Sequence, residues 1–196
     1  MIWSPIILYF VGVVTGKCSS KIPENNHGVG SVTIIDEVET LTQNKVKYLV
    51  QRTSTEWSLE FKFQINEDHS GSSVCSIIRV ATGRNNDFHD YGSRIPAILY
   101  NSGWKQVVSY WDLNGDSVGV FHRQDVKLGV NYHVKYQQQY INSGVYKASL
   151  EIDGVEVERM LNTQAEQFYD VKFYIADPWY PVCVGSVSDV KFTNFL

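Results

Sequence analysis

Alternation of apolar and polar residues with a period of two is the sequence feature that most constrains how this chain can fold. Between Glu56 and Asn66 the apolar positions are Trp57, Leu59, Phe61, Phe63 and Ile65, and the positions between them are Ser58, Glu60, Lys62 and Gln64. Successive side chains of a β-strand point to opposite faces of the sheet, so this pattern predicts a strand with one buried and one solvated face.

Similar segments recur along most of the chain and are separated by turn signals. The expected strands are Val32–Ile35, Val46–Gln51, Trp57–Ile65, Val74–Ala81, Ile95–Tyr100, Gln106–Trp111, Val118–His122, Tyr132–Tyr140, Val145–Ile152, Val155–Met160, Tyr169–Ala176 and Val184–Leu196. Asn114-Gly115 and Asp153-Gly154 favour two-residue hairpin turns, because both residue types adopt positive φ at low cost. No segment keeps a 3.6-residue apolar period for more than one or two turns. About a dozen short strands joined in this way predict an all-β, two-sheet antiparallel sandwich.

The first 20 residues resemble a secretory signal peptide. Ile6–Val14 form an apolar run that is too short to span about 30 Å of hydrocarbon, and small residues follow it. A signal peptide is therefore favoured over a membrane anchor, with cleavage after Ser20 or, alternatively, after Gly16. Residues 21–31 are expected to form a lead-in segment and residues 32–196 a single β-sandwich domain. The mature protein is expected to be secreted and extracellular.

Two cysteines, Cys75 and Cys183, remain after removal of residues 1–20. An even number of cysteines in an oxidising compartment predicts one disulfide between them, and a pair of buried free thiols is the alternative. Cleavage after Gly16 would leave Cys18 as a third thiol. The net charge of −4 is spread without runs of like charge, so neither nucleic acid nor an anionic membrane surface is expected as a partner.

The C-terminal third carries a more specific pattern. Its segments are Tyr146–Gly154, Asn162-Thr163 with Phe168, Val171–Tyr174, and Asp177-Pro178-Trp179-Tyr180-Pro181 before a last apolar strand; Glu56–Phe61 and Arg94–Ala97 belong to the same pattern. These segments resemble the concanavalin A-like lectin/glucanase superfamily, and within it the laminin-G-like single domains of secreted invertebrate proteins. The resemblance spans roughly Trp57 to Leu196. It implies a jelly-roll sandwich that binds glycans or matrix proteins and, in some branches, hydrolyses polysaccharides, although a fold alone does not assign a ligand.

A catalytic pair of acids is not completed along one strand. Hydrolase branches of the superfamily carry Glu-x-Asp-x-Glu, because the two carboxyl groups of a retaining enzyme must lie about 5 Å apart. Glu151-Ile152-Asp153 begins this pattern, but Val155 stands at its fifth position and Gly154 turns the chain. Asp153-Gly154 is thus better explained as a hairpin turn, and Glu156 and Glu158 as one polar face of the next strand. We therefore expect no catalytic residues and no enzymatic activity.

The polar segment Asn85–Tyr91 is the strongest candidate for a binding site. Its members are Asn85, Asn86, Asp87, His89, Asp90 and Tyr91. Their amides and carboxylates suit sugar hydroxyls or Ca²⁺, the Tyr91 ring suits a pyranose, and rim loops of sandwiches often carry binding residues. The alternative is that these residue types simply form turns.

A calcium loop is a weaker interpretation of a second polar segment. Asp112, Asn114 and Asp116 lie at the odd positions of such a loop, but Ser117 replaces the glycine at its sixth position and Arg123 the glutamate at its twelfth. A hairpin turn is favoured, and no metal or cofactor is expected, with Ca²⁺ left open. The rigid corner Asp177–Pro181 is expected to hold the last strand.

These observations predict a secreted, non-catalytic binding module for a glycan or an extracellular matrix partner. The alternative is a structural or interaction protein of an extracellular matrix, secretion or venom, with no small-molecule site. A polysaccharide hydrolase is a remote alternative, which loss of activity in Glu151→Gln would support.

Overall fold

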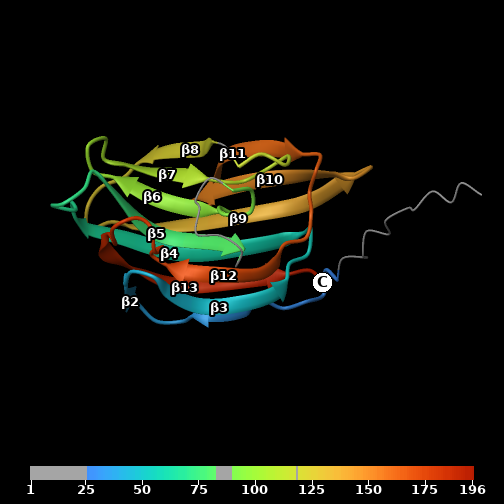
Figure 1. Cartoon of the computed structure of the whole chain (residues 1–196), viewed down its shortest axis with the longest axis horizontal. Helices are drawn as coiled ribbons and strands as arrows, with labels where there is room; N and C mark the ends of the chain where they lie inside the picture. Colours follow the sequence, from blue (N-terminus) through green and yellow to red (C-terminus); the bar gives the residue numbers. More distant parts are fainter. Residues whose placement is uncertain (1–25, 83–89, 118) are drawn as a thin grey trace, which may run out of the picture.

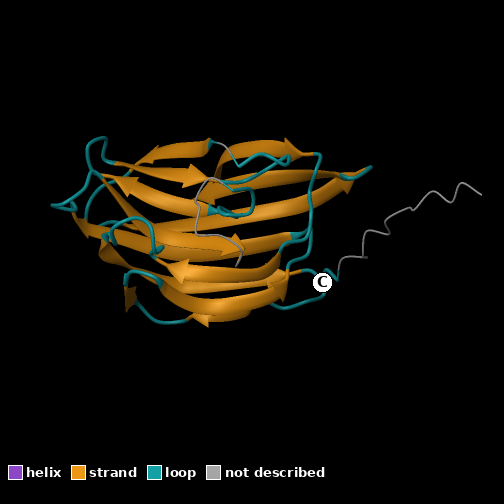
Figure 2. Ribbon diagram, viewed as in Figure 1, coloured by secondary structure: helices purple, strands orange, loops and turns teal. Residues whose placement is uncertain are grey.

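The structure, a computed structural model, describes residues 26–82, 90–117 and 119–196, and these residues form strands and loops without a helix (Figures 1 and 2). The strands are β1 (Val32–Ile35), β2 (Glu39–Thr40), β3 (Lys45–Arg52), β4 (Trp57–Glu67), β5 (Val74–Thr82), β6 (Ala97–Asn101), β7 (Gln106–Tyr110), β8 (Val120–Asp125), β9 (Asn131–Asn142), β10 (Val145–Ile152), β11 (Val155–Asn162), β12 (Tyr169–Ile175) and β13 (Val184–Asn194). Every predicted strand overlaps one of these, and only the two-residue β2 lacks a predicted counterpart.

The strands form two antiparallel sheets that pack face to face (Figure 1). The seven-stranded sheet has the order β1-β13-β4-β9-β10-β11, with β2 also paired to β13, and the six-stranded sheet has the order β3-β12-β5-β6-β7-β8. The predicted all-β, two-sheet antiparallel sandwich is confirmed. The last strand, β13, lies inside the seven-stranded sheet between β1 and β4, so the C-terminal segment is an integral part of the fold.

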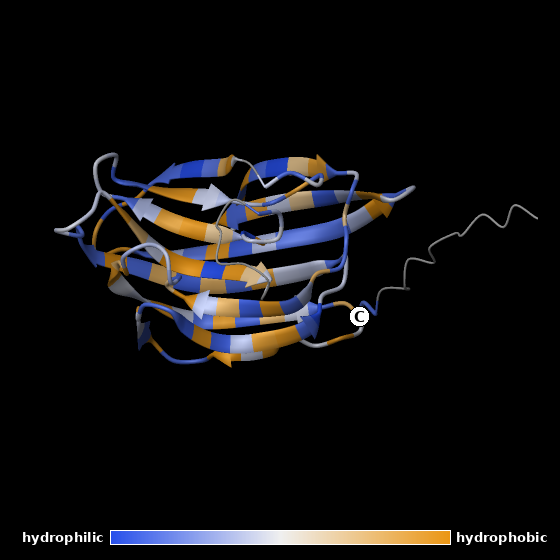
Figure 3. Ribbon diagram, viewed as in Figure 1, coloured by the Kyte–Doolittle hydropathy of each residue, from blue (hydrophilic) through white to orange (hydrophobic). Residues whose placement is uncertain are grey.

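The core is one cluster of buried residues from both sheets. Hydrophobic and hydrophilic residues alternate along several strands (Figure 3). In β4, Leu59, Phe61, Phe63 and Ile65 are all at most 1% exposed, whereas Lys62 between them is exposed. Trp57 packs on Trp111, which directly follows β7 of the six-stranded sheet, with ring centroids 5.1 Å apart. Burial of each such side chain stabilises the fold by about 1.5–3 kcal/mol.

The predicted disulfide between Cys75 and Cys183 is confirmed. It joins β5 to the segment just before β13, with the Cα atoms 4.9 Å apart and 108 residues between them in sequence. A crosslink that closes a loop of this length stabilises the fold by about 4 kcal/mol through loss of entropy in the unfolded chain.

The corner Asp177–Pro181 closes over the outer face of the six-stranded sheet. The Asp177 carboxylate is fully buried, accepts hydrogen bonds from the backbone N–H groups of Trp179 and Tyr180 at 3.0 and 2.7 Å, and pairs with Arg79 at 2.9 Å. The Arg79 guanidinium lies 4.4 Å from the centre of the Trp179 ring. Through Arg79, these contacts hold the corner against β5.

Candidate functional site

The predicted binding segment is only partly within the described residues. Asn85, Asn86, Asp87 and His89 lie outside them, while Asp90 is exposed and the Tyr91 ring packs against Phe168 with centroids 5.5 Å apart. Burial raises the pKa of the Tyr91 hydroxyl to about 12. Tyr91 thus contributes to packing, and a role of this segment in ligand binding stays a prediction.

The side chains of the weak calcium candidates brace neighbouring loops. Asp112 Oδ2 accepts hydrogen bonds from the backbone N–H groups of Gly92 and Arg94 at 2.9 and 3.0 Å. Asn114 donates to the Leu161 carbonyl at 2.9 Å and accepts from the Thr163 N–H at 2.7 Å.

Asp116 closes the same turn, its backbone N–H donating to the Leu113 carbonyl at 3.1 Å. Within the described ranges, no group of three or more His, Cys, Asp or Glu side chains is arranged to hold a metal ion. Burial raises the pKa of Asp112 to about 6, against the lowering effect of the Arg94 and Gly92 amides and the Arg94 charge.

The outer face of the seven-stranded sheet carries a set of closely spaced polar side chains. Antiparallel partners point to the same face, so the register places two rows of residues across β9, β10 and β11. One row is Gln137–Ser149–Arg159 and the other is Gln139–Lys147–Leu161. Their neighbours Tyr136, Ala148 and Leu150 are completely buried in the core, which fixes the direction of both rows toward the outside.

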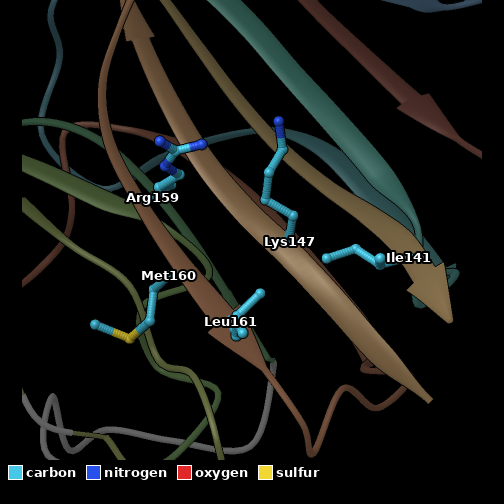
Figure 4. A pocket seen from close by; sticks show the side chains of 5 residues that line it. All are labelled: Ile141, Lys147, Arg159, Met160 and Leu161. Atoms are coloured by element: carbon cyan, nitrogen blue, oxygen red, sulfur yellow. The ribbon is translucent and has the colours of Figure 1, made fainter. Parts of the chain in front are cut away.

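A hollow of about 350 Å³ lies at the β11 end of these rows. It is lined by Ile141, Lys147, Arg159, Met160 and Leu161 (Figure 4), and we refer to it as the β11 hollow. These residues come from three neighbouring strands, β9, β10 and β11. The hollow therefore combines two cationic side chains with an apolar surface.

Two glutamates lie beside the β11 hollow on the same outer face. Glu151 on β10 is the direct cross-strand partner of Glu156 on β11. The Glu156 carboxylate contacts Lys147 Nζ at 3.2 Å and Arg159 Nε at 3.5 Å, and both cations line the hollow. This places an acid pair on adjacent strands rather than along one strand.

A β-bulge between Leu150 and Glu151 changes the register of β11 and turns Glu156 and Glu158 to different faces of the sheet. Glu158 pairs with the core residue Leu150 and lies 3.6 Å from His122 Nδ1 at the edge of the sandwich. The expectation that Glu156 and Glu158 share a face is therefore wrong. The pairing of Glu151 with Glu156 could have been predicted from the two-residue turn at Asp153-Gly154. Such a turn pairs Ile152 with Val155 and, one step further, Glu151 with Glu156.

A second hollow, of about 250 Å³, lies at the β4 side of the same rows. Its lining residues are His27, Glu56, Gln137, Gln139 and Phe195, and we call it the chain-end hollow because His27 and Phe195 lie near the two ends of the described chain. His27 Nε2 lies 2.8 Å from the carboxylate of Glu56, whose side chain is only 2% exposed. Sequence reasoning did not find this hollow, since its walls are distant in sequence.

Comparisons with known proteins give a structural likeness only. No protein-family model matches the sequence, and the search of curated proteins finds no relative. A sialidase from Trypanosoma rangeli matches with a TM-score of 0.51 and 14% identity over 71% of this chain and 20% of the sialidase. The same sialidase in complex with sialic acid matches with a TM-score of 0.51 and 15% identity, over the same 71% and 20% of the two chains.

Alginate lyases match less well. A mutant of alginate lyase Aly36B in complex with an alginate tetrasaccharide has a TM-score of 0.47 and 13% identity, over 80% of this chain and 78% of the lyase. An alginate lyase from Pseudomonas aeruginosa has a TM-score of 0.47 and 17% identity, over 71% of this chain and 64% of the lyase.

The prediction of a non-catalytic binding module, and with it the exclusion of an enzyme, is contradicted. The finding that overturns it is the likeness to the sialidase, which is an enzyme that acts on glycans. Of the three predictions, this likeness favours the remote alternative, a polysaccharide hydrolase. The chain spans about a fifth of the sialidase. In the part of the chain that the structure describes, no helix is long and apolar enough to cross a membrane. What the likeness shows is the fold, a β-sandwich that is also found in this sialidase.

Proposed function

We propose that this protein is a glycoside hydrolase whose active site lies on the outer face of the seven-stranded sheet, with Glu151 and Glu156 as its paired carboxylates. The observation that carries the proposal is their direct cross-strand register beside the β11 hollow. Directly opposed residues of an antiparallel pair have Cα atoms about 4.5–5.5 Å apart. Two glutamate side chains that leave such neighbouring Cα atoms on one face can bring their carboxyl groups to the separation of about 5–5.5 Å that a retaining mechanism uses.

The two glutamates have different surroundings, which assigns them different roles. The Glu156 carboxylate is positioned by Lys147 and Arg159, so it acts as the nucleophile that attacks the anomeric carbon. Glu151 takes no part in the contacts that Lys147 and Arg159 make with Glu156, and it protonates the leaving glycosidic oxygen. Water then attacks the glycosyl–enzyme ester, with Glu151 taking the proton of the water and Glu156 leaving as carboxylate.

The β11 hollow supplies the binding groups for the sugar next to the bond that is cleaved. Ile141 and Leu161 present apolar surface to a pyranose face, and Lys147 and Arg159 donate hydrogen bonds to hydroxyl or carboxylate oxygens. A sugar that carries a carboxylate fits these two cations best. The proposed substrate is accordingly an acidic glycan.

The test is release of reducing ends from sialylated glycan, alginate, chondroitin and a neutral β-glucan. Hydrolysis of at least one acidic substrate is expected, and Glu151→Gln and Glu156→Gln are each expected to lower its kcat by about 10² to 10⁴-fold. Glu60→Gln is the matched control, because Glu60 faces outward on β4, where it contacts His133 at 2.8 Å. Full activity in both Glu151 and Glu156 variants would overturn the assignment.

Secretion, extracellular location and the membership of a laminin-G-like branch are part of the same proposal. The disulfide between Cys75 and Cys183 is compatible with an oxidising compartment and supports secretion. An extracellular glycan, free or carried by a matrix protein, is then the partner. Expression of the full sequence in a secreting eukaryotic host, followed by N-terminal sequencing of the medium fraction, tests it; a mature chain that begins at Lys21 is expected, and retention inside the cell would contradict it.

A further inference from the structure

We propose that the β11 hollow and the chain-end hollow are two subsites of one binding surface, and that the enzyme therefore cleaves within glycan chains rather than at their ends. This inference rests on the proposed function and extends it from the chemistry to the form of the substrate. It is carried by the cross-strand register and the two sets of lining residues.

The two rows of outward side chains connect the hollows without a gap in the register. Gln137 and Gln139 line the chain-end hollow, and across β10 their rows end at Arg159 and Leu161, which line the β11 hollow. Lys147, the middle residue of one row, itself lines the β11 hollow. A ligand that leaves one hollow along the row through Lys147, which is partly exposed, arrives in the other.

The dimensions of this surface exceed a single sugar ring. From β4, which begins directly after Glu56, to β11, which carries Leu161, there are three inter-strand steps, or about 14 Å at about 4.8 Å per step. A single terminal sugar would fill one hollow and leave the other unused. An oligosaccharide laid across the strands fills both.

The chemistry of the chain-end hollow also suits a sugar. Gln137 and Gln139 provide amide donors and acceptors for hydroxyl groups, and the Phe195 ring, which meets the His27 ring edge-to-face at 5.5 Å, provides an apolar wall. The contact of His27 with the nearly buried Glu56 holds His27 next to the start of β4. His27 is thus part of one wall of the binding surface.

Binding as a function of ligand length tests the inference separately from catalysis. The probes are alginate and chondroitin oligosaccharides of two, four and six sugars, titrated by calorimetry into the full chain carrying Glu151→Gln. For at least one series, affinity is expected to rise about tenfold from two to four sugars, which equals about 1.4 kcal/mol. Adding Gln139→Ala is expected to remove that gain and to leave disaccharide affinity unchanged.

Gln64→Ala is the matched control, since Gln64 faces outward on β4 opposite Asn131, away from the lining of either hollow. Affinity that is independent of length in both series, absence of binding, or a length gain that survives Gln139→Ala would overturn the inference. Release of monosaccharides alone by an active, Glu151-dependent enzyme would also overturn it while leaving the proposed hydrolase intact. Length-dependent binding without Glu151-dependent hydrolysis would support the shared binding surface and refute the proposed catalytic pair.

Discussion

The buried Asp112 carboxylate makes the stability of this protein depend on pH in a specific direction. The side chain is 2% exposed and holds the segment around Gly92 and Arg94 through two backbone N–H groups. Burial raises its pKa from the ordinary 3.8 to about 6. The folded state therefore holds the Asp112 proton more tightly than the unfolded state between these two pH values.

The size of the effect follows from the two pKa values. At 1.36 kcal/mol per pH unit, the difference between 3.8 and about 6 corresponds to about 3 kcal/mol. The contribution is fully present below about pH 4 and is lost as pH rises through about 6. Asp112→Asn is neutral at every pH and keeps one oxygen acceptor for the two N–H groups, so it lacks this dependence.

The assay is urea unfolding of both proteins at pH 4, 5, 6 and 7. The free energy of unfolding of the wild type minus that of Asp112→Asn is expected to fall by about 2 kcal/mol between pH 4 and pH 7, because the unfolded carboxyl is already partly ionised at pH 4. Other carboxylates cancel in this difference. A difference that stays constant with pH, or that rises, would refute the reasoning.

Three further changes test the packing of the fold. Gly185→Ala is expected to destabilise the protein by about 1–3 kcal/mol in urea unfolding, because a Cβ there would lie 2.2 Å from the Gln64 carbonyl oxygen on the paired strand; unchanged stability would contradict the close approach. Replacing Cys75 and Cys183 together by Ala is expected to cost about 2–5 kcal/mol, and a melting temperature equal to that of the wild type would argue against a stabilising crosslink. Phe61→Ala, at a completely buried core position, is expected to cost about 3–5 kcal/mol by the same assay.

The sequence predicts most of the sandwich because its local signals agree with its tertiary structure. The alternation from Trp57 to Ile65 is strong enough to define both faces of β4 without knowledge of its neighbours. The Asp153-Gly154 turn has positive φ at both residues, 52° and 78°, as its dipeptide predicts. In contrast, β2 has only two residues and is defined by its pairing with β13, which no local pattern records.

The candidate site is less predictable because it depends on register and on contacts between distant segments. A single bulge next to Leu150 turns Glu156 and Glu158 to different faces of the sheet. The period-two pattern of the sequence does not predict where such a bulge occurs. The histidines likewise show no pairing in sequence, yet His27 and His133 lie 2.8 Å from Glu56 and Glu60. Such pairs arise from sheet order, which is set by the packing of the whole chain.

The central claim is that Glu156 forms a covalent bond to the sugar during catalysis. The most direct measurement is peptide mass spectrometry after incubation with a 2-deoxy-2-fluoro glycoside of the sugar that the enzyme hydrolyses, because the fluorine slows release of the glycosyl–enzyme ester. One glycosyl adduct is expected, located on Glu156 and absent from Glu156→Gln. An adduct on another residue, or an active enzyme that forms none, would contradict it.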